Sequence, residues 1–260
     1  IRRLQPKANI AICGPDIRWV GNEGGKCRKN EYSVVPLSLT KSEAVEKNSQ
    51  QSEGQAAALQ KFESTDEDLG SRSVLKNAGA LCWYPAEVDV SIRKGWFYSK
   101  NENRTVKSAK KLFHIYLNSV GNNCTLLLNV PPTDSGVIHR KDVKALAGLG
   151  EKIKSITANK VLVKKNVKLT KKNSYAEFSF NGTRKLKYVV IEEDTSFSQR
   201  VEAFDLYLKK PNNKYKKVYS GTIIGAKKII KIKNKSCIGA ALVIRQSRSN
   251  PIIKEIGFYA

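Results

Sequence analysis

The sequence contains no methionine, either at position 1 or elsewhere in its 260 residues. It opens with IRRLQPKANIAICGPD, which lacks the charged, apolar and small-residue order of a signal peptide. Instead, it looks like the end of a helix or loop followed by a strand. Both features are typical of a piece of a longer protein, with processing as the alternative, and we expect further sequence before Ile1.

Long apolar runs and metal ligands are also missing. No stretch of about 18 apolar residues occurs that could span a membrane. The only histidines are His114 and His139, and the five cysteines show no C-x-x-C spacing. We therefore predict no metal site and no cofactor. The odd cysteine count argues against a complete disulfide framework, and Cys13, Cys82 and Cys124 are predicted to be small buried hydrophobic residues.

Acidic residues are scarce, at 23 against 47 lysines and arginines, which gives a net charge of +24. Such a charge can indicate nucleic-acid binding. From residue 156 onward, 23 basic and 7 acidic residues give +16, but the lysines alternate with apolar residues, as in KKIIKIK at 227–233. This alternation is typical of a strand with one solvated face. We predict solvated surface and no nucleic-acid partner, and leave attraction to acidic glycans open.

Residues 1–156 alternate apolar strands with amphipathic helices. Strands are predicted at 8–13, 80–84 and 124–130, and helices at 106–120 and 140–155. In the second helix the residues predicted to face inward are Val143, Leu146, Ala147, Leu149 and Ile153. Apolar strands alternating with helices favour a parallel β/α architecture. A closed (β/α)8 barrel needs about 250 residues, so we predict its C-terminal part, with the missing units upstream.

Residues 157–260 show a different rhythm of short apolar runs separated by turns. The runs predict strands at 175–180, 186–191, 201–208, 215–219, 228–232, 239–244 and 252–259. Turn residues occur at Asn181-Gly182, Pro211–Asn213, Gly221 and Asn234. This pattern is typical of an antiparallel β-sandwich. The chain is thus predicted to hold two domains, 1–156 and 157–260.

Polar and aromatic residues gather at the predicted strand ends, where β/α barrels hold their active sites. In DIRWVGNEGG, residues 16–25, Glu23 lies among glycines whose backbone can approach a ligand closely. Trp19 and Asn22 could add stacking and hydrogen bonds. A surface loop with a solvated glutamate is the alternative.

A second stretch, WYPAEVDVSIRKGWFY at 83–98, places aromatic rings beside carboxylates. This combination suits a sugar, because the apolar ring face stacks while the hydroxyls need hydrogen-bond acceptors. The candidate substrate contacts are Glu87, Asp89, Arg93 and Trp96. A structural loop with an Arg–Asp pair is the alternative.

Several strings in this order carry a resemblance to a known family: GPDIRWVGNEGG, YSVVP, DLGSR, WYPAEVDVSIRKGWFY and LLLNVPPTDSGVIH. Together they resemble the α-L-fucosidases of glycoside hydrolase family 29, and most closely the branch that cleaves α-1,3/4-linked fucose from branched glycans. QRVEAF, GTIIG and PIIKEIGFY are similar to the C-terminal β-sandwich of that family. The resemblance covers nearly the whole chain and implies the C-terminal portion of such an enzyme.

The resemblance implies a retaining mechanism with two carboxyl groups about 5–5.5 Å apart. Glu23 matches the acid/base, and the nucleophilic aspartate is expected upstream of Ile1, so the chain alone is expected to be inactive. Trp96 matches the aromatic residue that packs against fucose. Glu87, Asp89 and Arg93 are expected either to contact the substrate or to support the loop.

Two positions depart from the family pattern, since Lys94 stands where proline is usual and Ser99 where histidine is common. The leaving-sugar preference therefore stays open. The resemblance implies a fucosylated oligosaccharide or glycoprotein glycan as partner, and a secreted or periplasmic location. A non-catalytic glycan-binding protein of the same fold is the alternative.

Overall fold

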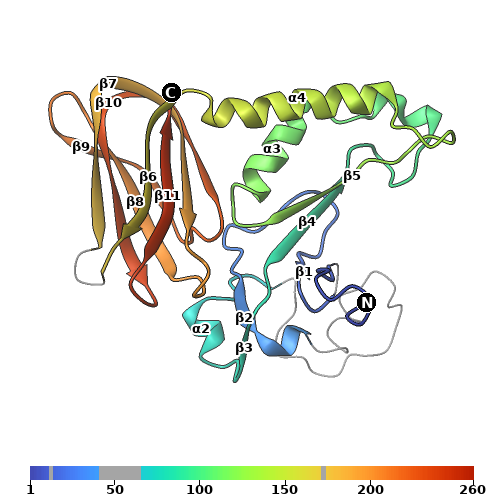
Figure 1. Ribbon diagram of the computed structural model, residues 1–260, viewed down its shortest axis with the longest axis horizontal. Helices are drawn as coiled ribbons and strands as arrows, with labels where there is room; N and C mark the ends of the chain where they lie inside the picture. Colours follow the sequence, from blue (N-terminus) through green and yellow to red (C-terminus); the bar gives the residue numbers. More distant parts are fainter. Residues whose placement is uncertain (12–13, 41–65, 171–173) are drawn as a thin grey trace. The chain divides into compact units, whose positions relative to one another are not determined.

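A computed structural model of the chain describes residues 1–11, 14–40, 66–170 and 174–260 (Figure 1). The chain divides into two compact units. Unit 1 comprises Ile1–Val90 and Cys124–Asn129, and unit 2 comprises Ser91–Asn123 and Val130–Ala260. None of the helices in the described ranges is long and apolar enough to cross a membrane.

Unit 1 is built on two small sheets. In the first, β4 (Ala86–Ser91) lies between β1 (Arg18–Trp19) and β5 (Thr125–Asn129), and β1 runs parallel to β4. The second is an antiparallel pair of β2 (Val34–Pro36) and β3 (Leu81–Trp83). The short helices η1 and α2 complete the described part of the unit, at Leu37–Thr40 and Arg72–Leu75.

The predicted strands of unit 1 are partly confirmed. Strands form as β3 and β5, but β3 pairs antiparallel with β2 instead of joining the parallel sheet. Residues 8–11 form no strand, because Asp16 folds back and accepts a hydrogen bond from the Ile10 amide at 2.7 Å; Ile12 and Cys13 lie outside the described residues. Strand β4 was not predicted, since its two carboxylates interrupt the apolar pattern.

Unit 2 contains the two predicted helices. Helix α3 (Ala109–Ser119) begins after Ser108, whose hydroxyl accepts a hydrogen bond from the Lys111 amide, and α4 (Arg140–Thr157) begins after His139. The short helix η2 spans Lys100–Arg104. Helices α3 and α4 pack together, and they approach so closely that a Cβ on Gly148 would lie 2.9 Å from the Ala109 side chain.

The inward face predicted for α4 is partly wrong. Val143 and Ala147 are exposed, whereas Asp142, Ala145, Leu149 and Ile156 are buried. The physical reason is an ion pair, since Asp142 faces a buried arginine of the same unit. A buried charge needs such a partner, and periodicity of apolar residues cannot detect it.

Six strands form the antiparallel sheet of unit 2, in the order β6-β11-β7-β10-β8-β9. They are β6 (Lys160–Lys168), β7 (Tyr175–Glu193), β8 (Val201–Lys209), β9 (Tyr215–Gly221), β10 (Lys228–Ser247) and β11 (Ile252–Tyr259). Two predicted pairs of short strands merge into β7 and β10, which pair along their length with register shifts. The predicted turns at Asn181-Gly182 and Asn234 therefore do not end strands, and β6 was not predicted.

One apolar core joins strands from distant positions in that order. Phe258 of β11 packs against Phe178 and Phe180 of β7, with ring centroids 5.1 Å apart in each case, and Phe204 of β8 belongs to the same cluster. This arrangement is consistent with the predicted β-sandwich. Ile230 and Ile232 are buried while Lys231 and Lys233 are exposed, which confirms the predicted alternation there. The domain boundary at 156/157 stays a prediction.

Candidate active site

The two faces of strand β4 differ in polarity, since one is apolar and the other carries carboxyl groups. Ala86 and Val88 pack into an apolar cluster with Val20 and Cys124. Glu87 and Asp89 alternate with them, and successive side chains of a strand point to opposite faces. The two carboxyl residues are only 3% and 5% exposed, respectively. The strand thus carries two buried acidic groups on one face, an arrangement that costs free energy unless polar partners compensate it.

Asp89 has a specific partner on the neighbouring strand. The indole Nε1 of Trp19 donates a hydrogen bond to Asp89 Oδ1 at 2.8 Å. Burial raises the pKa of Asp89, the Trp19 hydrogen bond opposes this, and the negative charge of Glu23 raises the pKa further. The predicted residues Trp19, Glu23 and Asp89 therefore belong to one electrostatic cluster in unit 1.

Glu87 completes the cluster of acidic groups. Its Oε1 is buried without a hydrogen-bond partner in the described part of the chain. Burial raises the pKa of Glu87, and the charge of Asp89 raises it further. Glu87 and Asp89 therefore retain protons more readily than the same groups do in water. Such a setting suits proton transfer.

The loop that carries Glu23 is tied to the end of β4. Gly24 forms an antiparallel bridge with Val90, and the amide of Gly25 donates to the Asp89 carbonyl at 3.0 Å. Gly25 has a φ of 67°, a conformation that side chains other than glycine rarely adopt. Glu23 itself is half-buried. The loop therefore has a defined backbone path beside the buried carboxyl groups.

Asn22 uses both ends of its side-chain amide within this loop. Its Nδ2 donates to the Lys26 carbonyl at 2.9 Å, and its Oδ1 accepts from the Gly24 amide at 3.0 Å. These contacts favour a loop-shaping role for Asn22. Its predicted role in substrate binding stays a prediction.

A buried ion-pair network closes the same loop, and the sequence analysis did not identify it. Arg18 and Arg28 hold the two oxygens of Glu31, at 3.0 and 2.8 Å. Burial alone would raise the pKa of Glu31, but the charges of the two arginines keep it below its ordinary value. Cys27 also contacts Cys124, and the hydrogen bond between the two thiols raises the pKa of Cys124. These ion pairs and the thiol contact hold the C-terminal end of the loop that carries Glu23 in place.

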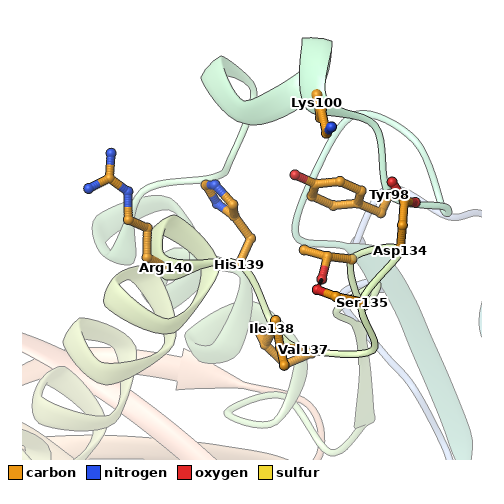
Figure 2. A pocket seen from close by; sticks show the side chains of 9 residues that line it. Tyr98, Lys100, Asp134, Ser135, Val137, Ile138, His139 and Arg140 are labelled. Atoms are coloured by element: carbon orange, nitrogen blue, oxygen red, sulfur yellow. Dashed lines mark hydrogen bonds between the residues drawn. The ribbon is translucent and has the colours of Figure 1, made fainter.

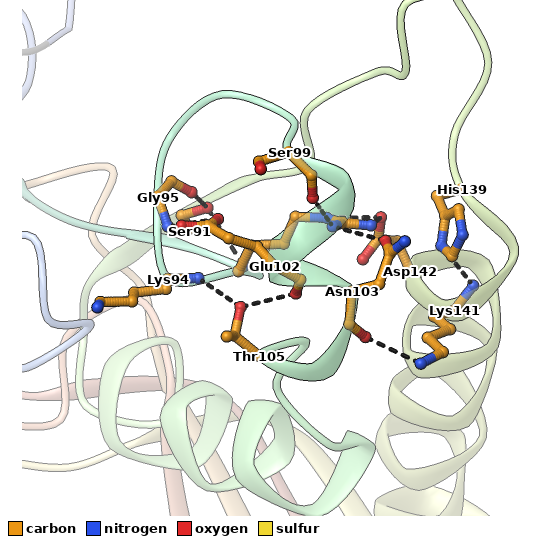
Figure 3. Close-up of polar contacts among 11 residues, drawn as sticks. Ser91, Lys94, Gly95, Ser99, Glu102, Asn103, Thr105, His139, Lys141 and Asp142 are labelled. Carbon is orange, nitrogen blue, oxygen red and sulfur yellow. Dashed lines mark hydrogen bonds and ion pairs between the residues drawn. The ribbon is translucent and has the colours of Figure 1, made fainter.

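In unit 2, Arg93 is fully buried and belongs to the same loop as Trp96. Figure 3 shows the polar contacts around this loop, with Asn103 and Asp142 among the residues that make them. The Nη2 of Arg93 lies 2.7 Å from Asp142 Oδ2, and its Nη1 donates to Asn103 Oδ1 at 3.0 Å. The guanidinium also lies 4.8 Å from the ring centroid of Tyr98. These contacts favour loop support over substrate contact for Arg93.

Further hydrogen bonds fix the loop around Trp96, which is half-buried. Ser91 Oγ donates to the Gly95 carbonyl at 2.6 Å, and the Gly95 amide donates to Glu102 Oε2 at 3.0 Å. The Lys94 amide donates to Thr105 Oγ1 at 3.1 Å. Proline has no amide hydrogen, so the family's usual residue at this position could not make that bond. The departure at Lys94 therefore adds a constraint to the loop.

A pocket of about 530 Å³ lies in the same unit (Figure 2). The rings of Tyr98 and His139 line it, with centroids 6.1 Å apart. Its other lining residues are Lys100, Thr133, Asp134, Ser135, Val137, Ile138 and Arg140. Hydroxyl, carboxylate and cationic groups beside aromatic rings are suited to binding a polar ligand such as a sugar. The lining residues from Thr133 to His139 lie in the string LLLNVPPTDSGVIH, to whose residues the sequence analysis assigned no role.

The predicted site residues thus divide between the units. Trp19, Asn22, Glu23, Glu87 and Asp89 lie in unit 1, where β1, β4 and the Glu23 loop bring them together. Arg93 and Trp96 lie in unit 2. In the described part of the chain, histidine, cysteine, aspartate and glutamate form no group of three or more that could hold a metal ion.

Comparisons with known proteins agree on one family. The family model for alpha-L-fucosidase matches residues 14–156. Alpha-L-fucosidase 1 of Arabidopsis thaliana is 31% identical over 291 residues, which cover 100% of this chain and 53% of that protein. This chain therefore spans about half the length of that curated relative.

Solved structures show the same similarity. A crystal structure of a candidate alpha-L-fucosidase from Bacteroides ovatus has a TM-score of 0.84 and 36% identity, and the match covers 100% of this chain and 43% of that one. A glycoside hydrolase 29 family member from an unknown rumen bacterium has a TM-score of 0.73 and 29% identity, with the same coverage of each chain.

Proposed function

Because the chain belongs to the alpha-L-fucosidase family, we propose that the whole protein is a retaining α-L-fucosidase that releases terminal α-1,3/4-linked L-fucose from glycans. The match over 14–156 supports the enzyme class. The linkage rests on the order of the WVGNEGG and WYPAEVDVSIRKGWFY strings. We further propose that β1 and β4 belong to a β/α barrel, which their parallel pairing supports.

The observation that carries the proposal is the cluster formed by Glu87 and Asp89 on β4 and by Glu23 on the neighbouring loop. In the proposed mechanism a nucleophilic aspartate attacks the anomeric carbon of fucose and the glycosidic C–O bond breaks. Glu23 donates its proton to the departing oxygen, which leaves as a hydroxyl of the remaining glycan. We propose that this aspartate lies in the half of the protein that this chain does not include. In the second step Glu23 removes a proton from water, and the water oxygen displaces the aspartate from the anomeric carbon.

The other residues have supporting roles in this proposal. Asp89 and Glu87 are buried acceptors, and the raised pKa of each reflects surroundings that disfavour negative charge there. Trp19 holds Asp89 in place through its indole N–H. Trp96 supplies the aromatic surface for the fucose ring, on a loop that Arg93 supports from below the surface.

The substrate is proposed to be a fucosylated oligosaccharide or glycoprotein glycan. The lining of the pocket beside Tyr98 supports a glycan ligand, since it combines ring surface with hydroxyl and charged groups. Such glycans occur outside the cytoplasm, and we propose a secreted or periplasmic location.

The test uses the whole protein and its Glu23→Gln variant, with a Lewis-type trisaccharide and an aryl α-L-fucoside as substrates. Loss of the acid/base should lower kcat/KM for the trisaccharide by about 10²–10⁴-fold, the usual contribution of a general acid. The aryl fucoside should lose less in its glycosylation step, because its leaving group needs little protonation. The measurement is fucose release under initial-rate conditions.

Glu151→Gln is the matched control, since Glu151 is an exposed residue of α4. It should leave both rates unchanged. Trisaccharide hydrolysis that survives Glu23→Gln would exclude the acid/base assignment. A folded parent that binds but does not cleave either substrate would favour the non-catalytic glycan-binding alternative.

A further inference from the structure

A second surface of unit 2 has no role in the proposed reaction. A groove of about 230 Å³ is lined by Leu208, Lys210, Pro211, Lys216, Val218, Lys235 and Ser236. Three of these residues are lysines and none is acidic. We call this surface the lysine groove.

Separate segments bring the three lysines together. Lys210 and Lys216 flank the hairpin between β8 and β9, which turns at Pro211–Asn213. The Lys210 amide and the Lys214 carbonyl are hydrogen-bonded at 2.9 Å across that turn. Lys235 comes from the middle of β10, where it is paired with Leu186 of β7. The cations therefore converge through the backbone pairing of the sheet.

These lysines differ from four other lysines in or next to the same sheet. Lys165, Lys217, Lys227 and Lys254 each lie within 4 Å of a carboxylate, at distances from 3.1 to 3.9 Å. Across the described residues, Lys210, Lys216 and Lys235 form no such ion pair. All three are exposed. Like charges that gather without counter-charges repel one another, and an external anion would relieve that repulsion.

The surroundings of the groove are also basic. Arg184 and Lys185 are exposed on β7, in register with Cys237 and Ser236 of β10. Acidic groups do reach this hairpin. Asp205 of β8 pairs with Lys217 at 3.5 Å, and, after burial, the charge of Glu177 raises the pKa of Tyr215. Neither of these carboxylates is among the residues that line the groove, and the excess of positive charge is consistent with the +16 carried by residues 156–260.

We propose that the lysine groove binds an anionic polysaccharide. Carboxylate or sulfate groups along the polymer pair with Lys210, Lys216 and Lys235, and the apolar faces of its sugar rings pack on Pro211 and Val218. A single-stranded nucleic acid fits less well, because no aromatic side chain lines the groove to stack a base. The proposal goes beyond fucose hydrolysis and does not depend on it.

The test measures binding of the whole protein to polygalacturonate, with neutral dextran as the uncharged probe, by isothermal titration calorimetry. The variant K210E/K216E/K235E should raise Kd for polygalacturonate at least ten-fold at 50 mM salt. Raising the salt to 200 mM should weaken parental binding, because exposed charges are screened. Dextran should bind neither protein.

The matched control is K160E/K164E/K168E, which makes the same charge change on β6, at the opposite edge of the strand order. It should change Kd less than three-fold.

Equal losses in both triple variants, or tighter binding of single-stranded DNA than of polygalacturonate, would overturn the proposal. Hydrolysis of the aryl fucoside should be unchanged in K210E/K216E/K235E, and polygalacturonate binding unchanged in Glu23→Gln, so the two proposals fail separately. Circular dichroism checks that each variant is folded.

Discussion

The Glu23 loop of unit 1 and the Trp96 loop of unit 2 are both held by a buried arginine paired with a carboxylate, but the two pairs are built differently. Glu31 follows Arg18 by 13 residues and uses both oxygens, one for Arg18 and one for Arg28. Asp142 lies 49 residues after Arg93 and receives two hydrogen bonds on Oδ2 alone. Its Oδ1 has no hydrogen-bond partner in the described part of the chain.

The difference shows two ways to fix a loop. In the loop that carries Glu23, the ion pair joins residues that are close in the sequence, so only a short chain segment has to be ordered to form it. The second loop depends on helix α4 to supply the carboxylate. In both cases the desolvation of the ions offsets much of their attraction, so each pair specifies geometry more than it adds stability. Removing one partner, however, leaves a buried charge.

The largest effect is expected for Glu31→Gln. The substitution removes the negative charge from two arginines, one of which is 1% exposed. We expect the free energy of unfolding to fall by about 5 kcal/mol, at the upper end for a broken buried pair. Urea denaturation measures it, with the exposed Glu151→Gln as control. A loss below about 1 kcal/mol would show that this network does not hold the loop.

A somewhat smaller effect is expected for Asp142→Asn. It leaves one buried arginine with neutral partners, and we expect a loss of about 4 kcal/mol in urea denaturation. The double variant Arg93→Met/Asp142→Leu should recover most of this loss, because apolar residues need no counter-charge. Failure of the double variant to exceed Asp142→Asn in stability would contradict the ion-pair account.

A third buried carboxylate, Glu193, sharpens the comparison, because no arginine side chain in the described ranges forms an ion pair with it. Glu193 accepts backbone hydrogen bonds from Arg200, Val201 and Gly225, at 2.6, 2.9 and 3.1 Å. Burial raises the pKa of Glu193 to about 7 from an ordinary value of 4.5, and these donors oppose the shift. The folded state therefore holds a proton that the unfolded state releases between these values.

The sign of the resulting pH dependence follows from this proton. Stability from Glu193 is fully present below pH 4.5 and is lost as pH rises through about 7, by up to about 3 kcal/mol. Urea denaturation at pH 4.5–7.5 measures the change. Glu193→Gln should flatten the profile over this window. Identical profiles for the parent and the variant would show that Glu193 does not titrate in the window.

The sequence by itself determined the features that depend on near neighbours in the chain. The 3.6-residue period of apolar residues predicted α3, and the alternation of lysine with isoleucine at 227–233 predicted a strand with one exposed face. The ordered strings GPDIRWVGNEGG and WYPAEVDVSIRKGWFY were sufficient to indicate the family. These signals are local because backbone geometry repeats every few residues.

Only the tertiary structure decided which polar residues are buried and against what. It placed Glu87 and Asp89 on a strand, turned α4 so that Asp142 meets Arg93, and gave Asn22 partners within its own loop. It also merged the predicted short strands into β7 and β10. A buried polar side chain needs a hydrogen-bond or ion-pair partner, and that partner often lies far away in the sequence. Composition and periodicity do not identify it.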